Sequence, residues 1–180
     1  MKKIFLLIIP FCFAFAFTSS GQKNYAKLVD SLQYVTKVPY IHNCDDPIFW
    51  KIVGEGKNIV PFLIDKMTDT TTLKEIYVPN FGGEYTVADV AYIAIQEIIA
   101  GIPTLKLLGV SFDKVCGYCS YWNHVRYSVE NRVKFQSAVR HWYEQNKNKL
   151  VWVDYFGILA GECPSPIKGH YEVKRKEKGK

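Results

Sequence analysis

Residues 86–101 read TVADVAYIAIQEIIAG, and this is the most regularly patterned stretch of the chain. Its apolar side chains recur every three or four positions, which is the spacing of one face of an α-helix. Thr86 and Asp89 have the spacing of a capping box, in which two side chains satisfy free N–H groups at a helix start. Gly101-Ile102-Pro103 ends the pattern. We therefore predict a helix with a wide apolar face over 86–100.

Spacing and boundary residues predict further helices on both sides of this stretch. Asn24 to Thr36 carries one apolar stripe and stops before Pro39, because the residue preceding a proline is pushed out of the helical conformation. Asp45-Asp46-Pro47 is a strong start signal, since an Asp side chain caps free N–H groups and proline loses nothing at the first helical position. The predicted helices are 24–36, 47–54, 58–67 and 128–149.

The remaining segments show little sign of strand. Residues 73–85 are predicted to be irregular or weakly extended, and 150–153 form either a short strand or the packed end of the long helix. The fold class is therefore mainly α, with four or five helices in a short helical stack or a helical bundle and an irregular cysteine-bearing loop over 109–123. The apolar face of the long helix is expected on Val129, Val133, Val139, Trp142 and Tyr143.

Residues 57–69, which read KNIVPFLIDKMTD, resemble the second helix and exit turn of a HEAT-like repeat. Residues 85–101, with small alanines in an apolar face, are similar to other helices of such repeat proteins. The resemblance implies a short helical stack whose function is to offer a binding surface. Repeat stacks need about three units for stability, and because this chain holds two or three, an ordinary helical bundle is the alternative.

The first 21 residues are typical of a secretory signal peptide. Met1-Lys2-Lys3 is a short basic head, Ile4 to Phe17 is almost wholly apolar, and small polar residues follow. The apolar run is shorter than the ~20 residues of a membrane span. We therefore predict that 1–21 are a signal peptide, that the protein is exported to the periplasm or the extracellular space, and that no transmembrane segment remains. An uncleaved anchor is the alternative.

Charge is distributed unevenly beyond this leader. Residues 22–167, which we predict to be a single helical domain, hold 15 basic and 15 acidic side chains. Residues 168–180 hold six basic and two acidic ones and are predicted to be a basic, disordered tail. The balanced domain argues against binding of nucleic acid, which needs clustered Lys and Arg on a folded surface. Weak attraction of the tail to an anionic envelope surface is an alternative role.

Disulfide bonds are the chemistry that the cysteine content favours. An even number of cysteines in an exported protein indicates oxidised pairs, and three pairings are possible. We prefer pairings that tie the first and the last cysteine to the central two, because these would fasten both ends of the domain to the loop. The four cysteines beyond the leader are Cys44, Cys116, Cys119 and Cys163.

Cys116-Gly117-Tyr118-Cys119 also has the spacing of a redox pair. In this alternative the protein is an envelope thiol–disulfide oxidoreductase, with Cys116 as the nucleophile and Cys119 as the resolving thiol. Gly101 to Leu108 resembles a strand of the thioredoxin fold, but it lies before the cysteines. This order of elements favours structural disulfides over catalysis.

Zinc is a further alternative for the same two cysteines, although exported cysteines are more often oxidised than metallated. The usual attached haem is excluded, because Ser120 stands where the axial histidine should follow the second cysteine. We therefore expect no cofactor. The zinc ligands in the alternative would be Cys116, Cys119 and His124, completed by Cys44, Cys163 or His42.

Other catalytic signatures are absent from the sequence. It contains no nucleophile elbow, no metalloprotease histidine pair and no glycine-rich phosphate loop. Asp89 and Glu97 lie on a similar side of the predicted 86–100 helix, where a solvated face is favoured over an acid–base pair.

These patterns predict a small exported helical module that binds or supports another molecule without catalysis. Its partner would be a protein or another envelope ligand. Aromatic side chains anchor interfaces efficiently, so the candidate binding residues are the aromatic ones around the cysteine pair, and burial beneath the loop is their alternative role. They are Tyr118, Tyr121 and Trp122.

Overall fold

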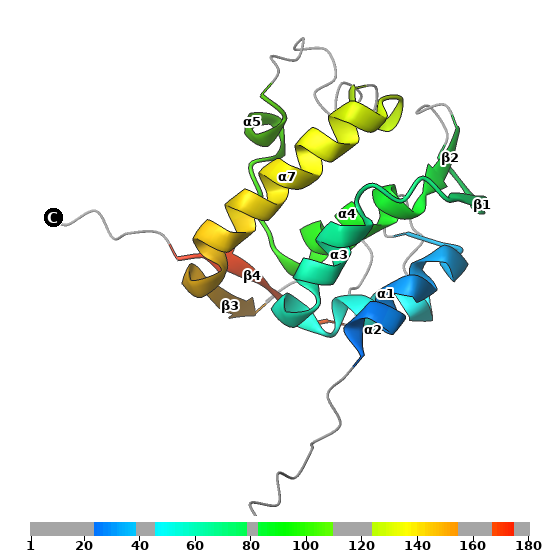
Figure 1. The fold of residues 1–180 in the computed structure, drawn as a ribbon. Helices are drawn as coiled ribbons and strands as arrows, with labels where there is room; N and C mark the ends of the chain where they lie inside the picture. The colour runs from blue at the N-terminus through cyan, green and yellow to red at the C-terminus, as the bar shows by residue number, and fades with distance from the viewer. Residues whose placement is uncertain (1–23, 39–45, 79–82, 110–123, 155–166, 175–180) are drawn as a thin grey trace, which may run out of the picture.

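The computed structural model describes residues 24–38, 46–78, 83–109, 124–154 and 167–174, and this part of the chain is mainly helical (Figure 1). Two small antiparallel sheets complete it. The helices are α1 (Tyr25–Asp30), α2 (Pro47–Val53), α3 (Val60–Lys66), α4 (Val87–Ile98), α5 (Thr104–Leu108) and α7 (Val129–Asn146), with 3-10 turns η1 (Ser31–Tyr34), η2 (Gly56–Asn58) and η3 (Lys147–Lys149). The strands are β1 (Thr72–Val78), β2 (Gly83–Thr86), β3 (Leu150–Asp154) and β4 (Gly169–Val173).

Helix α4 forms the centre of the fold. All of its residues are buried except Gln96 and Glu97. Helices α2 and α3, strands β2 and β4 and the η1 turn pack against it. A helix that is apolar around most of its circumference must be enclosed by other elements, and the alanines of α4 allow them to approach closely. The helix predicted over 86–100 is confirmed, although it is enclosed on more sides than one apolar face suggests.

The predicted start of α2 at Asp46-Pro47 is also confirmed. Asp46 Oδ1 accepts hydrogen bonds from the backbone N–H groups of Ile48 (3.0 Å) and Phe49 (2.8 Å). Its Oδ2 accepts the N–H of Thr36 at 2.9 Å, so the same carboxylate holds the segment that follows η1 against the start of α2. Both carboxylate oxygens of this buried side chain therefore have hydrogen-bond partners, as buried polar groups require.

Two predicted helices are interrupted by tighter turns. The helix expected over 24–36 ends as α1 at Asp30 and continues as the 3-10 turn η1 to Tyr34. The helix expected over 58–67 is preceded by η2, and regular α-helix runs only from Val60 to Lys66. Short 3-10 turns are common at the ends of helices, where sequence patterns are least informative.

Residues 72–86 contain an antiparallel hairpin where the sequence predicts irregular or weakly extended chain. Leu73 of β1 lies opposite Tyr85 of β2, and the register then shifts before Tyr77. Over residues 72–76, where the burial of side chains is described, the buried ones are Leu73 and Ile76, which are three positions apart. This irregularity breaks the alternation of period two by which a strand is recognised in a sequence.

Strand β4 lies inside the segment predicted to be a disordered tail. Its Tyr171 lies opposite Trp152 of β3, with the two rings edge to face at 5.2 Å between centroids. The carbonyl oxygen of Tyr171 accepts the N–H of Ala100 at 2.9 Å, directly after α4. The predicted disorder is therefore wrong for Gly169–Val173, because these contacts hold a basic segment on the domain, and residues 175–180 lie outside the described part. Residues 150–153 are a strand, one of the two predicted alternatives.

The segment that resembles a thioredoxin strand is instead helical. Residues 104–108 form α5, which packs against α7. Thr104 Oγ1 lies 2.5 Å from the Tyr92 hydroxyl, so a hydrogen bond joins the start of α5 to α4. Most of the cysteine-bearing loop that was predicted to follow it lies outside the described residues.

Helix α7 confirms the predicted long helix, and Val139 and Tyr143 of its predicted apolar face are buried, but the prediction is wrong at the start of the helix. Val129 and Val133, which were expected to face the core, are 69% and 50% exposed. The reason is that Arg132 occupies a core position of α7. A pattern of apolar residues does not predict a charged side chain in the core. The buried residues are Arg132, Phe135, Val139 and Tyr143.

Candidate functional site

The candidate disulfide, redox, zinc and binding residues that the sequence analysis identifies lie almost entirely outside the described segments. Of the predicted zinc ligands, His124 alone is described, and Asn131 Nδ2 donates a hydrogen bond to its carbonyl oxygen at 2.8 Å. No group of three or more His, Cys, Asp or Glu side chains in the described segments is arranged to hold a metal ion. The other proposed residues, all outside those segments, are His42, Cys44, Cys116, Tyr118, Cys119, Tyr121, Trp122 and Cys163.

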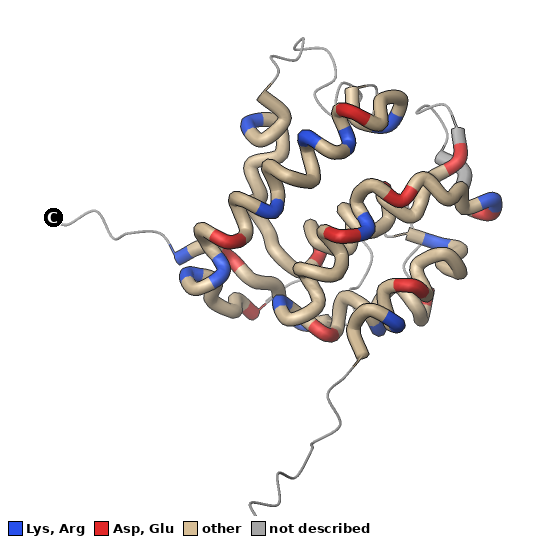
Figure 2. The backbone as a smooth tube through the Cα atoms, in the orientation of Figure 1, with Lys and Arg blue, Asp and Glu red and all other residues tan. Residues whose placement is uncertain are grey.

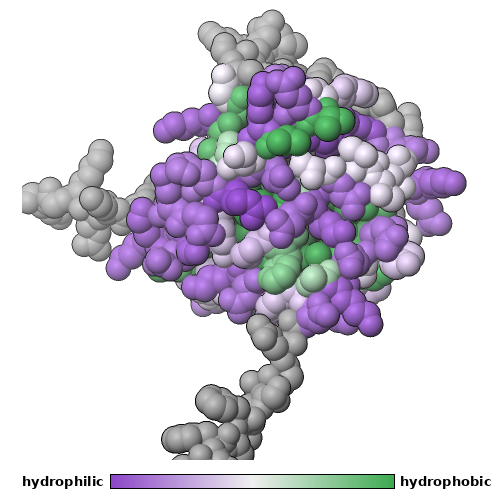
Figure 3. Space-filling model, in the orientation of Figure 1, coloured by the Kyte–Doolittle hydropathy of each residue, from purple (hydrophilic) through white to green (hydrophobic). Residues whose placement is uncertain are grey.

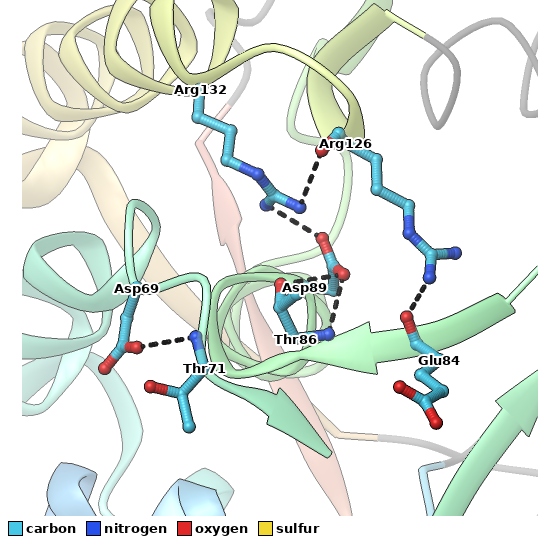
Figure 4. Close-up of polar contacts among 7 residues, drawn as sticks. All are labelled: Asp69, Thr71, Glu84, Thr86, Asp89, Arg126 and Arg132. Carbon is cyan, nitrogen blue, oxygen red and sulfur yellow. Dashed lines mark hydrogen bonds and ion pairs between the residues drawn. The ribbon is translucent and has the colours of Figure 1, made fainter. Parts of the chain in front are cut away.

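A buried ion pair between Asp89 and Arg132 is the most unusual polar feature of the described structure (Figure 4). Arg132 Nη1 lies 2.9 Å from Asp89 Oδ1, and the two side chains are 3% and 2% exposed. Asp89 belongs to the first turn of α4, and Arg132 belongs to the first turns of α7. The pair therefore joins two helices that are far apart in the sequence.

The remaining oxygen of Asp89 closes the start of α4. Asp89 Oδ2 accepts hydrogen bonds from the backbone N–H of Thr86 at 2.9 Å and from its hydroxyl at 2.8 Å. This is the capping box that the sequence predicts, and an aspartate is long enough to close it here. The predicted solvated position of Asp89 is therefore wrong, because the side chain is buried. Asp89 does not form an acid–base pair with Glu97 either, because its carboxylate oxygens accept hydrogen bonds from Thr86 and Arg132.

The preceding chain satisfies the other free N–H groups at the start of α4. The carbonyl oxygens of Thr71 and Asp69 accept the N–H groups of Val87 and Ala88, both at 2.9 Å. Asp69 Oδ1 in turn accepts the N–H of Thr71 at 3.1 Å. Burial opposes ionisation of this carboxyl, but the hydrogen bonds from Thr71 and the ammonium of Lys66 hold the pKa of Asp69 below its ordinary value. The helix start has no N–H left over for an anionic ligand.

Arg132 has a second contact that extends the cluster. Its Nη2 donates to the carbonyl oxygen of Arg126 at 3.3 Å, while the guanidinium of Arg126 donates to the carbonyl oxygen of Glu84 in β2. Nε of Arg132 is buried and has no hydrogen-bond partner among the described residues. The cluster thus ties β2, α4 and the start of α7 into one unit.

The contacts of this cluster join secondary-structure elements to one another. Both carboxylate oxygens of Asp89 have partners inside the protein, one in Arg132 and the other in Thr86. What the pair does is fix the rotation of α7, since Arg132 must face α4 to reach Asp89. Sequence analysis missed this role, although two signals were present: an aspartate inside an apolar helix, and an arginine at the spacing of Phe135 and Val139.

The rotation of α7 leaves large side chains exposed near α5. Val129 and Val133 lie one turn apart on α7, and their side chains point away from the core. Tyr127, just before the helix, is 65% exposed. Leu105 of α5, which packs beside α7, is 48% exposed. Figure 3 shows apolar side chains gathered at the end of the molecule where α5 and the first turns of α7 lie. We call these four residues the α5–α7 face.

Comparisons with protein families, curated proteins and solved structures found no match for the chain. The resemblance to HEAT-like repeats therefore stays a prediction. Within the described segments, no helix combines the length and the apolar character that crossing a membrane requires.

The ion pair predicts a specific pattern of unfolding free energies. Asp89→Asn or Arg132→Met alone should lower the free energy of unfolding by about 3–5 kcal/mol, because each leaves one buried charge without its partner. The double variant should lose clearly less than the sum of the two, as measured by urea unfolding in a double-mutant cycle.

Lys134→Met is the matched control for this cycle. Lys134 lies on the same helix but pairs with Glu130 at the surface, where both side chains are more than half exposed. Its loss should change the unfolding free energy by less than about 1 kcal/mol. Additive effects of Asp89→Asn and Arg132→Met would show that the two charges are not coupled.

Proposed function

We propose that the protein is a small exported helical module that binds a protein partner through the α5–α7 face and has no catalysis of its own. The observation that supports this is the exposure of Leu105, Val129 and Val133 on two packed helices. Single exposed apolar residues are common on protein surfaces, but several on one face are typical of interaction sites. The partner would offer an apolar surface to this face.

The support of α7 makes this face suitable for binding. Arg132 is held by Asp89, and Gln136 Nε2 donates to the carbonyl oxygen of Ile64 in α3 at 2.7 Å. Further along the helix, the Tyr143 hydroxyl donates to the carbonyl oxygen of Lys57 at 2.9 Å. A helix fixed at three points along its length loses little conformational freedom on association, and preorganisation of this kind favours affinity.

The finer architecture belongs to the same proposal. We propose a helical stack or bundle with a cysteine-bearing loop, stapled by disulfide bonds at Cys44, Cys116, Cys119 and Cys163 after removal of a signal peptide over 1–21. The even cysteine number and the form of the leader support it. The loop aromatics Tyr118, Tyr121 and Trp122 would extend the binding surface.

Thiol–disulfide exchange at Cys116 and Cys119 has less support. The segment that resembled a strand of a thioredoxin fold forms helix α5. The Cys-x-x-Cys spacing is then the one observation that supports thiol–disulfide exchange.

Site-specific crosslinking tests the binding face. A photo-crosslinking residue at position 133, introduced into the full chain in its native cells, should give a discrete adduct with one protein. The same residue at Lys51, an exposed position on α2, should give little. Val129→Glu should reduce the adduct at position 133 by about tenfold or more, because burial of a carboxylate in an apolar interface is costly.

The identified protein should then bind the purified chain and lose binding on Val129→Glu, with unchanged thermal unfolding. Equal adducts at positions 133 and 51, or binding that is indifferent to Val129→Glu, would contradict the proposal.

Thiol labelling distinguishes the module from the oxidoreductase. In the exported protein, Cys44, Cys116, Cys119 and Cys163 should resist alkylation until strong reductant is added, because structural disulfides are hard to reduce. Peptide mass spectrometry reads each site. Release of Cys116 and Cys119 alone by mild reductant, followed by fast labelling of Cys116 at neutral pH, would favour catalysis instead.

A further inference from the structure

The exposed side of helix α7 carries an apolar stripe and a charged stripe. Residues three or four positions apart are neighbours on the surface of a helix. Val129, Val133 and Ser137 make the first stripe, and all three are exposed. Glu130 and Lys134 make the second, and each lies three positions before a residue of the first. The two stripes are therefore adjacent, and we call these five residues the outer α7 face.

The charges of this face are paired within the chain but remain in water. Lys134 Nζ forms a salt bridge with Glu130 Oε1, and the two side chains are 68% and 76% exposed. Figure 2 shows acidic and basic positions close together in the first turns of α7. An exposed pair of this kind contributes little to stability, whereas a network of several charges contributes more. Both side chains are therefore available for a second ion pair with another molecule.

The outer α7 face matches itself when two copies meet with antiparallel helices. In an interface with two-fold symmetry, the same surface patch of each copy meets the other. If the helices are antiparallel, the apolar stripe meets the apolar stripe and the charged stripe meets the charged stripe. In a parallel pair, each charged stripe would meet the apolar stripe of the other copy. The antiparallel pair is thus the arrangement that places no charge on valine.

The spacing of the residues supports the same arrangement. A two-fold axis that places Val133 against Val133 of the second copy also places Val129 opposite Ser137, whose small side chain leaves room for it. Glu130 then lies two residues, or about 3 Å along the helix, from the level of Lys134 in the second copy. These long side chains span that offset. Symmetry repeats the contact, so the two copies share two new ion pairs.

We propose that two copies of the chain associate through their outer α7 faces with the helices antiparallel. This inference rests on the proposed binding through Val129 and Val133, and it names a second copy as the partner. All five residues of the face are used by a second copy. Residues 22–167 hold 15 basic and 15 acidic side chains, so no net charge of the domain opposes the association.

The small size of the face predicts a weak, reversible dimer. Few residues take part, so we expect a Kd of tens of micromolar or weaker. Below that concentration the chain is monomeric. Unfolding and solvent exposure that are measured on dilute protein therefore report on the monomer.

Sedimentation equilibrium of the purified exported protein measures the Kd of this dimer. Glu130→Lys and Lys134→Glu, made separately, should each weaken association by about tenfold or more, because each places like charges opposite each other at two symmetric positions. The double variant with both changes should associate within about threefold of the unaltered protein, because opposite charges then face each other again.

An equimolar mixture of the two single variants separates contacts between copies from contacts within one chain. In the mixed pair, residues 130 and 134 of one copy face the opposite charge on the other copy at both positions. The mixture should therefore associate about tenfold more tightly than either variant alone. Repair within one chain does not produce this result, because each variant carries two like charges on its own helix.

The matched controls reverse one exposed charge elsewhere, through Lys51→Glu on α2 and Glu75→Lys on β1. They change the net charge by the same amounts as the two α7 variants. Their Kd should stay within about twofold of the unaltered protein, alone or mixed, because salt screens distant charges. Thermal unfolding of dilute protein checks that every variant folds.

Two outcomes would overturn the inference. One is a purified chain that stays monomeric at high concentration. If the photo-crosslinking residue at position 133 then captures a different protein, the proposed binding face stands without a second copy, and if it captures nothing, both proposals fail. The other outcome is a dimer for which the mixture of variants associates no more tightly than each variant alone, which would show that the copies do not meet through antiparallel α7 helices.

Discussion

The buried pair of Asp89 and Arg132 is the constraint on which the rest of the described fold depends. A charge removed from water is tolerated only with its partner in good geometry, and loss of one partner costs several kcal/mol. The pair therefore sets both the position of α7 beside α4 and its rotation about its own axis. Because Asp89 also closes the start of α4, one carboxylate links helix initiation to helix packing.

The two ends of α7 have different surroundings. At the start of the helix, Val129 and Val133 are turned outward beside α5. At its far end, the chain enters β3 and pairs with β4, which brings Lys149 next to Lys174. The proposed partner surface therefore lies at one end of α7, and the β3–β4 pair lies at the other.

Much of the fold follows from the sequence where local rules dominate. The mainly helical character, the central helix, the capping box at Thr86 and the start of α2 at Asp46 are decided by residues within one or two turns, and each is confirmed. The face of α7 and strand β4 could not be predicted in the same way. Arg132 is a core residue because it pairs with Asp89, which belongs to another helix. Tyr171 is held in β4 by contacts with Ala100 and Trp152, which are distant from it in the sequence.

The same reasoning explains the outcome for the candidate sites. Residue types and spacing identify cysteines and aromatic residues as chemically capable, but they do not show which side chains converge. The α5–α7 face arises from the rotation of a helix, which is set by contacts between residues far apart in the sequence. A Cys-x-x-Cys spacing, in contrast, is local.

The most direct test of this account is the solvent exposure of valine methyl groups on α7. In an NMR experiment with a soluble paramagnetic agent, the methyl signals of Val129 and Val133 should broaden strongly, while those of Val139 should be protected. That result would confirm the rotation imposed by Asp89 and Arg132. Protection of Val129 and Val133 together with Val139 would contradict it and restore the helix face that apolar spacing alone predicts.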